Sequence, residues 1–258
     1  MADDVGTLFD CEMGVGSSGL GFPSTPTALD LLSVMDRYAI AEALVYDRHA
    51  HESGMLDRFD AVVSFCAASP RLHPTVPVVP PATGEQPPPE QLVDQCLDLG
   101  VKALRACPVA HNYLCDRHTM GPLLAVMERR RMPLIHTSMQ VQDHPWLHVP
   151  PWSAIREIAL AFPRLPVVVL YTGMLQNRNL LPLLAECPNV LADLTCSSFQ
   201  FVERVVESLG STRLVLASHY PTEDPGLYAP WLSHAGVSAA DLARIAGDNI
   251  RRLLAEVR

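Results

Sequence analysis

Residues 165–195 read LPVVVLYTGMLQNRNLLPLLAECPNVLADLT and divide into three segments. The first, 165–172, is a short apolar run, the second, 178–187, is an amphipathic stretch, and the third, 189–195, is another short apolar run. The two runs show little alternation between apolar and polar residues, which is expected of strands that are covered on both faces. A strand, a helix and a second strand in this order predict two parallel strands joined by a helix.

The same alternation extends over the rest of the chain. Eight strand-like segments occur in it: 6–13, 41–47, 73–80, 101–107, 133–138, 165–172, 189–195 and 213–219. The helix-like stretches that follow them are 25–39, 53–69, 88–100, 120–131, 151–163, 178–187, 198–211 and 238–258. Eight such units in 258 residues predict a single (β/α)8 TIM barrel domain over residues 1–258. The alternative is a doubly wound open sheet, but this would normally have fewer strands, and neither GxGxxG nor GxxxxGK(S/T) follows the first one.

Composition narrows the class of protein. The chain is 48% hydrophobic and 18% charged, with a formal charge of -9 and no basic block beyond residues 129–131, which argues against nucleic-acid binding. The N-terminal residues lack the features of a secretory signal, and no stretch approaches the ~18 apolar residues of a membrane span, so we expect a soluble cytoplasmic protein with a small-molecule substrate and no membrane partner. The seven cysteines contain no CxxC pair, so buried reduced thiols are expected rather than disulfides or structural zinc.

Titratable and polar side chains follow the strand-like segments. In a TIM barrel the catalytic residues stand at the C-terminal ends of the strands. In chain order these residues are Asp10, Glu12, Tyr46, Asp47, Arg48, His49, Arg105, Cys107, His111, His136, Ser138, Tyr171, Asp193, Thr195 and His219. Apolar strands that end in such groups are typical of an active site.

The whole chain, from about residue 8 to 254, resembles the amidohydrolase-related (amidohydrolase 2) family of metal-dependent hydrolase barrels. That family includes aminocarboxymuconate semialdehyde decarboxylase and related lyases. Besides residues 165–195, the blocks that carry the likeness are LFDCEMGVG (8–16), LLSVMDRYAIAEALVY (31–46), MPLIHTS (132–138), RLVLASHYPTEDPG (213–226) and IAGDNIRRLL (245–254). The resemblance implies a TIM barrel that acts by hydrolysis or C–C lysis on a small carboxylated or carbonyl substrate. Relatives often dimerise, so a homodimer is one expectation.

The metal ligands of that family are depleted in this chain. The first strand of the family ends D-x-H-x-H, and the matching positions here are Asp10, Glu12 and Gly14. The histidine of strand five is retained as His136, whereas the histidine of strand six is replaced by Tyr171. The aspartate of strand eight, which is a metal ligand and proton carrier in the family, is replaced by His219. The chain thus resembles a branch with depleted ligands that shares the block LVYDRHAHESG (44–54).

One interpretation is a remodelled metal site. Glu12, His136 and His219 would together make a set of two histidines and one carboxylate. These ligand types suit one divalent ion, zinc or iron, and leave coordination positions open for substrate or water. The alternative is that each residue is a hydrogen-bonded remnant and that no metal binds.

A second interpretation is a metal-free acid/base lyase or isomerase. His219 or His136 would act as the general acid or base, and Tyr171 would supply a proton or a hydrogen bond. Arginine suits a substrate carboxylate because it donates two parallel hydrogen bonds to it. The substrate-binding candidates are Arg105, Arg48, His49 and His111.

A third interpretation is a non-catalytic pseudoenzyme that binds a ligand or partner. A barrel mouth plugged by Trp146 and Trp152 would favour it, and an open polar cavity would favour catalysis. We favour an enzyme over this alternative.

Two further features are given structural roles. His49 and His51 form an H-x-H pair that we expect to lie in an exposed loop. Cys107 and Cys196 are expected to be buried thiols, since neither has a visible base beside it in the sequence.

Overall fold

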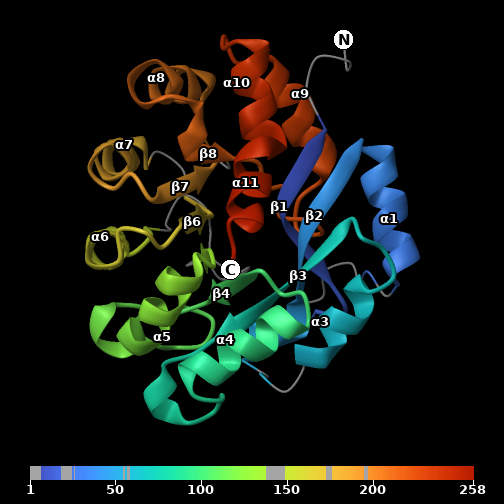
Figure 1. Cartoon of the computed structure of the whole chain (residues 1–258). Coiled ribbons are helices and arrows are strands. Elements are labelled where there is room, and N and C mark those ends of the chain that lie inside the picture. The colour runs from blue at the N-terminus through green and yellow to red at the C-terminus, as the bar shows by residue number, and fades with distance from the viewer. Residues whose placement is uncertain are drawn as a thin grey trace.

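The computed structural model describes residues 7–18, 25, 27–54, 56, 59–137, 149–172, 176–194 and 197–258. Its eight parallel strands pair in chain order, from β1 to β8 (Figure 1). The strands are β1 (Leu8–Val15), β2 (Ile40–Asp47), β3 (Leu72–Val78), β4 (Ala103–Ala106), β5 (Leu134–Thr137), β6 (Val167–Leu170), β7 (Val190–Asp193) and β8 (Leu214–Val215). This arrangement confirms the predicted (β/α)8 barrel, although β4 to β8 are shorter than their apolar runs in the sequence.

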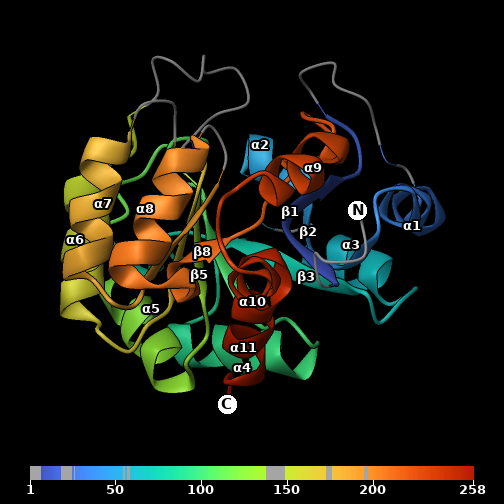
Figure 2. The ribbon, with the colours of Figure 1, turned by 90° about the horizontal axis from the view of Figure 1, so that it is seen from above.

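Helices surround the strands on the outside (Figure 2). The α-helices are α1 (Ala28–Arg37), α2 (Arg48–Ser53), α3 (Phe59–Cys66), α4 (Pro89–Asp98), α5 (Arg117–Arg130), α6 (Trp152–Ala161), α7 (Asn177–Glu186), α8 (Phe199–Leu209), α9 (Tyr228–Ser233), α10 (Ala239–Ala243) and α11 (Asn249–Ala255). Short 3-10 turns are η2 (Pro81–Thr83), η3 (Ser211–Arg213) and η4 (Pro225–Leu227), and η5 (Arg244–Asp248) is a π-helical turn. Capping boxes begin α1 at Thr27 and α5 at Asp116, where side-chain oxygens satisfy the first free amides of the helix.

The barrel closes where β1 meets the segment that follows β8. The amide of Cys11 donates to the carbonyl of Leu216 at 2.9 Å, and the amide of Gly14 donates to the carbonyl of Tyr220 at 2.7 Å. These two bonds join β1 to the segment that continues β8, so the strands form a nearly closed ring.

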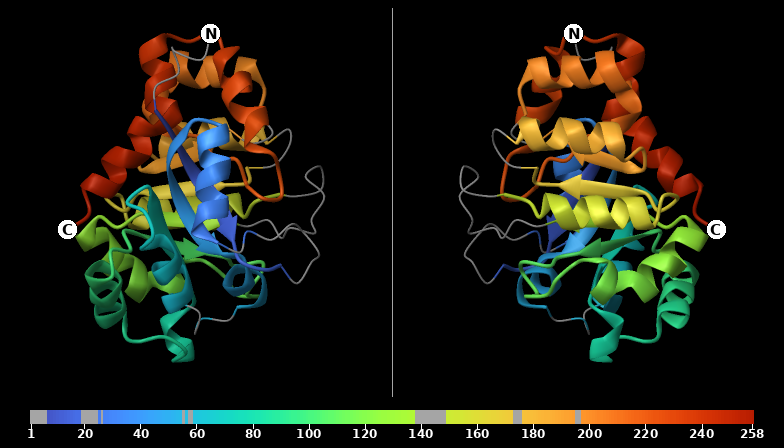
Figure 3. Two further views of the ribbon diagram at one scale, coloured as in Figure 1. Left: turned by 90° about the vertical axis from the view of Figure 1, so that its right-hand side faces the viewer. Right: turned by 90° about the vertical axis from the view of Figure 1, so that its left-hand side faces the viewer.

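Two apolar layers pack against the strands. The outer layer fills the space between strands and helices, and the inner layer fills the barrel with side chains that include Phe9, Cys11, Ile135 and Leu170. The strand β1 has an irregularity between Asp10 and Met13, and its side chains change face there. Cys11 lies in the inner layer, whereas Met13, two residues later, lies in the outer layer. Helix α11 lies at the end of the barrel where β1 begins (Figure 3) and adds Ile250, Leu253 and Leu254 to the inner layer.

The segment after β2 differs from its prediction. Residues 48–53 form α2, which is capped by the Asp47 side chain through the amide of Ala50 at 2.7 Å. Helix α2 buries His51, which is 4% exposed, so the expectation of an exposed His49–His51 loop pair was wrong. The buried thiols were predicted correctly for six cysteines, at positions 11, 66, 96, 107, 115 and 187. Within the described part of the chain, no helix has the length and apolarity needed to cross a membrane.

Candidate active site at the strand ends

A buried ion pair crosses the barrel between β1 and β4. Nη1 and Nη2 of Arg105 donate to Oε1 and Oε2 of Glu12 at 2.9 and 2.6 Å. Both side chains are buried, with exposures of 0% and 1%. The guanidinium carbon also lies 4.3 Å from the ring centroid of Tyr46, in cation–π contact. Glu12 therefore has both oxygens occupied by a fixed internal cation.

Tyr46 fills the space above Gly14, which pairs with it in the register of β1 and β2. A Cβ atom at Gly14 would lie 2.8 Å from the Tyr46 hydroxyl and 2.8 Å from Cγ of Arg48. Real Cβ atoms do not approach other atoms so closely, so a larger residue at position 14 would displace both side chains. Burial and the negative charge of Glu12 raise the pKa of Tyr46, which keeps its hydroxyl protonated.

A second buried pair joins β7 to the segment after β8. Nε2 of His219 lies 2.8 Å from Oδ2 of Asp193, and both side chains are fully buried. The same Oδ2 accepts the backbone amide of Tyr171 at 3.0 Å, and the Tyr171 ring lies 3.6 Å from the imidazole ring, centroid to centroid. Burial opposes the charge on His219, but the hydrogen bond and charge of Asp193 outweigh it and raise the pKa of His219.

Two residues at this site, Tyr171 and His219, adopt left-handed backbone conformations. Tyr171 has a φ of 55° and His219 a φ of 58°. Such values are uncommon for residues with a Cβ, cost of order 1 kcal/mol and cluster at functional sites. Both follow the ends of strands and both contact Asp193, Tyr171 through its backbone amide and His219 through its ring.

Asp10 fastens β1 to the segment after β8. Its Oδ1 accepts the amides of Glu12 at 2.9 Å and Ser218 at 3.0 Å. Burial raises the pKa of Asp10 to about 6, against the lowering effect of these hydrogen bonds. Asp10 thus fixes the backbone of Glu12 and of Ser218, the residue before His219.

His136 does not share a face of the sheet with Arg105. His136 pairs in register with Ala106 and Val169, which belong to the outer layer. Arg105 pairs with Ile135 of the inner layer. Residues paired in register share a face of the sheet, so His136 and Arg105 point to opposite faces.

A metal ion does not fit the predicted ligand set. Both oxygens of Glu12 are bound to Arg105, Nε2 of His219 is bound to Asp193, and His136 lies on the other face. Among the residues that the structure describes, no three His, Cys, Asp or Glu side chains are grouped so that they could hold an ion.

The predicted substrate-binding residues other than Arg105 lie around α2. Arg48 is buried and its Nη2 donates to Glu52 at 3.1 Å, whereas His49 is half-buried on the same helix. Nε2 of His111 donates to the carbonyls of Ala50 and His51 at 3.1 and 3.0 Å. His111 therefore fastens the β4–α5 loop to α2.

Cys107 and His51 form a close pair beside Arg105. The sulfur lies 3.2 Å from Nδ1 of His51. Burial raises the pKa of Cys107 to about 12, and burial together with the charge of Arg105 lowers the pKa of His51. The pair is a neutral thiol and a neutral imidazole, as expected of a buried structural cysteine.

Sequence reasoning placed Asp193 and Tyr46 at strand ends but assigned them no role. A signal for Asp193 was present, because a carboxylate that ends an apolar strand needs a buried partner. Thr137, which is 1% exposed at the end of β5, was missed. Ser138, Trp146, Thr195 and Cys196 lie outside the described residues.

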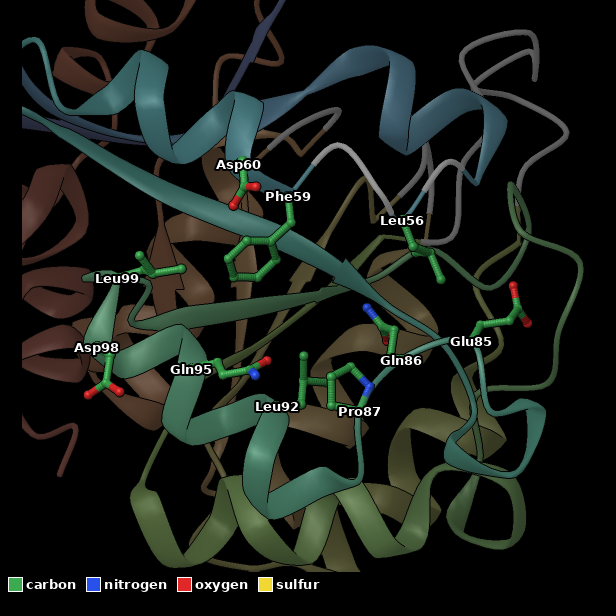
Figure 4. A pocket seen from close by; sticks show the side chains of 10 residues that line it. All are labelled: Leu56, Phe59, Asp60, Glu85, Gln86, Pro87, Leu92, Gln95, Asp98 and Leu99. Carbon is green, nitrogen blue, oxygen red and sulfur yellow. The ribbon is translucent and has the colours of Figure 1, made fainter.

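A cavity of about 530 Å³ lies on the flank of the barrel, between α3, α4 and the turn after β3. Phe59 of α3 and Leu92 of α4 line it together with Pro87, as Figure 4 shows. The side chain of Gln86 is held by the amide of Val79 and the carbonyl of Pro77, so it supports the turn after β3. None of the predicted site residues lines this cavity.

Comparisons with known proteins agree with this fold. A family model described as amidohydrolase matches residues 29–255, and the search of curated proteins found no match. An uncharacterized TIM-barrel protein from Bordetella bronchiseptica has a TM-score of 0.74 and 16% identity, with 96% of this chain and 98% of that chain covered. The 5-carboxyvanillate decarboxylase of Sphingomonas paucimobilis has a TM-score of 0.71 and 14% identity, with 97% and 99% covered. A dihydroxybenzoic acid decarboxylase from Polaromonas sp., with bound manganese and the inhibitor 2-nitroresorcinol, has a TM-score of 0.71 and 14% identity, with 97% of each chain covered.

Proposed function

The chain belongs to the amidohydrolase family, and from this premise we propose that it is a decarboxylase-like lyase that acts on a small carboxylated substrate. The reaction takes place at the C-terminal ends of the strands and uses acid/base catalysis by side chains of the chain itself. The decarboxylases among the structures of similar fold support this choice of reaction.

The observation that carries the proposal is the buried pair of His219 and Asp193, with Nε2 and Oδ2 2.8 Å apart. Burial opposes the charge on His219, but the hydrogen bond and charge of Asp193 raise its pKa, so Asp193 favours the protonated imidazole, which can act as a general acid. The Tyr171 ring packs against the imidazole at a tilt of 36° and restricts its orientation.

The chemical step follows from this arrangement. The bond between the substrate carbon and its carboxylate breaks, the electron pair passes to that carbon, and carbon dioxide leaves. The same carbon then takes the proton from the imidazolium of His219, which regains a proton from solvent. Asp193 stabilises the imidazolium before the transfer and orients the ring throughout.

No step of the proposed mechanism involves a metal. The manganese in the Polaromonas structure belongs to that protein. In this chain Arg105 already satisfies Glu12, and the site is built from two paired charges rather than from open ligands. An ion pair that is hydrogen-bonded and buried is costly to open, because each charge would be left uncompensated.

Turnover of small aromatic carboxylates tests the proposal. The panel begins with dihydroxybenzoate and 5-carboxyvanillate, and the release of carbon dioxide is measured before and after dialysis against a chelator. We expect turnover to survive the chelator. His219→Gln is expected to lower kcat by about 10²–10⁴, the usual contribution of a general acid, and Asp193→Asn is expected to lower it as well.

The matched control is His118→Gln, which changes an exposed histidine at the start of α5 and should leave kcat unchanged. Full turnover in His219→Gln would disprove the role of the histidine. Loss of turnover with the chelator, followed by recovery with manganese, would disprove the metal-free mechanism.

A further inference from the structure

Arg105 has a donor that the ion pair leaves unused. An arginine side chain carries five N–H donors in a rigid plane, and Glu12 is bound at the tip of this plane by Nη1 and Nη2. Nε of Arg105 is buried and has no hydrogen-bond partner. The Nε–H on the side of the guanidinium therefore makes no hydrogen bond within the described part of the chain.

Thr137 offers a second unused donor on the neighbouring strand. Its Oγ1 is buried and also has no partner among the residues described. Thr137 pairs in register with Leu170 of the inner layer, and Arg105 pairs with Ile135 of the same layer. Both side chains therefore face the barrel interior, and Thr137 lies two residues nearer to the mouth than Ile135.

Another buried threonine of the inner wall, Thr75, shows the usual arrangement. Thr75 pairs in register with Ala103 of the inner layer, and its Oγ1 donates to the carbonyl of Val45 at 3.0 Å. Buried polar groups are generally paired, because an unpaired donor loses its hydration without compensation. Two unpaired donors on adjacent strands, both facing inward, indicate that a ligand supplies their acceptors.

We propose that Nε–H of Arg105 and the hydroxyl of Thr137 bind one carboxylate group of the substrate, and that this group is not the one that leaves. This inference rests on the proposed function and names the substrate class as a small acid with a second carboxylate. The side of the guanidinium offers two N–H bonds in the geometry that suits a carboxylate, while Glu12 holds the tip.

The identity of the bound group follows from the energetics of decarboxylation. Pairing the leaving carboxylate with arginine would stabilise the ground state more than the transition state, because the charge of this carboxylate disappears as carbon dioxide forms. Only interactions that strengthen in the transition state accelerate the reaction. A carboxylate that keeps its charge throughout can use Arg105 as an anchor without slowing the step.

The first test measures stability in the absence of substrate. Thr137→Val preserves shape and removes a hydroxyl that has no protein partner, so its Tm should equal or exceed that of the wild type. Thr75→Val removes a hydroxyl that is bonded, so its Tm should fall by about 2–4 °C. An equal fall in both variants would overturn the proposal, because Thr137 would then have a partner within the protein.

The second test measures binding of benzoate by calorimetry, with benzamide as the neutral probe. We expect benzoate, and not benzamide, to bind the wild type and Thr75→Val alike. The dissociation constant should rise about tenfold in Thr137→Val and remain close to the wild-type value in Thr137→Ser, which keeps the hydroxyl.

Equal affinity in Thr137→Val, or no binding by the wild type, would overturn the proposal. The catalytic role of His219 and the carboxylate site at Arg105 and Thr137 can be disproved independently of each other. His219→Gln tests the chemistry, and it should bind benzoate as the wild type does whether or not His219 is the acid.

Discussion

Asp10 has one oxygen that is satisfied and one that is not. Oδ1 accepts two backbone amides, whereas Oδ2 is buried without a hydrogen-bond partner among the described residues. Burial therefore favours the protonated form and raises the pKa from 3.8 to about 6. A folded protein that holds this proton more tightly than the unfolded chain loses stability as the pH rises from about 4 to above 6.

Asp10→Asn is expected to remove this pH dependence. The amide keeps an oxygen that can accept the same backbone amides but carries no charge at any pH. We expect the free energy of unfolding to rise at pH 8, by up to about 3 kcal/mol for a shift of this size, and to change little at pH 4. Urea unfolding at the two pH values measures the difference.

The control for this change is Asp60→Asn, at an exposed position on α3 that should show no such difference between the two pH values. A variant at position 10 that is less stable than the wild type at pH 8 would show that the ionised carboxylate is needed there.

The side chain of Asn249 binds the start of helix α11 to the barrel. Nδ2 of Asn249, at the first position of the helix, donates to the carbonyls of Ser211 and Leu214, both at 2.8 Å. The turn before it passes so close to β1 that a Cβ at Gly247 would lie 2.8 Å from the carbonyl oxygen of Thr7. The spacing of glycine and asparagine in residues 245–254 thus reflects one close approach and one hydrogen-bonded anchor.

Asn249→Ala should destabilise the protein without changing the site. Two buried carbonyls lose their side-chain donor, and we expect the free energy of unfolding to fall by about 1–3 kcal/mol. Urea unfolding measures this loss, with Gln91→Ala on the exposed face of α4 as a control that changes it by about 0.5 kcal/mol or less. Equal values for the two variants would refute the anchoring role.

The barrel was predictable from the sequence because each unit repeats the same local pattern of strand and helix. Few folds accommodate eight such units in succession. The site was less predictable. Glu12 faces the interior only because β1 changes face between Asp10 and Met13, and apolar patterning does not reveal this change. Its partner Arg105 lies 93 positions away along the chain, so the ion pair depends on barrel closure. The retained His136 was expected at the mouth, yet the register of β5 turns it toward the outer layer.

The base of the barrel joins the start and the end of the chain through Arg251. Its Nε donates to Glu42 of β2 at 2.7 Å, and its Nη2 donates to the carbonyl of Thr7 at 3.0 Å. Glu42 also contacts Nε2 of His73 at 2.9 Å, and the His73 ring stacks on Phe9. Helix α11, β1, β2 and β3 are therefore connected through a single half-buried cluster.

Arg251→Ala should weaken the barrel as one cooperative unit rather than loosen α11 alone. The substitution removes hydrogen bonds to Glu42 and to the residue before β1, so we expect the free energy of unfolding to fall by about 1–3 kcal/mol. Arg252→Ala, which removes an exposed pair with Glu256 on the same helix, should change it by about 0.5 kcal/mol or less. Far-ultraviolet circular dichroism follows the helices, and tryptophan fluorescence follows the environment of side chains that include Trp152 on α6. Coincident transitions at a lower urea concentration would establish that closure at the base stabilises the distant strand ends, whereas an early transition seen by circular dichroism alone would show that α11 unfolds separately.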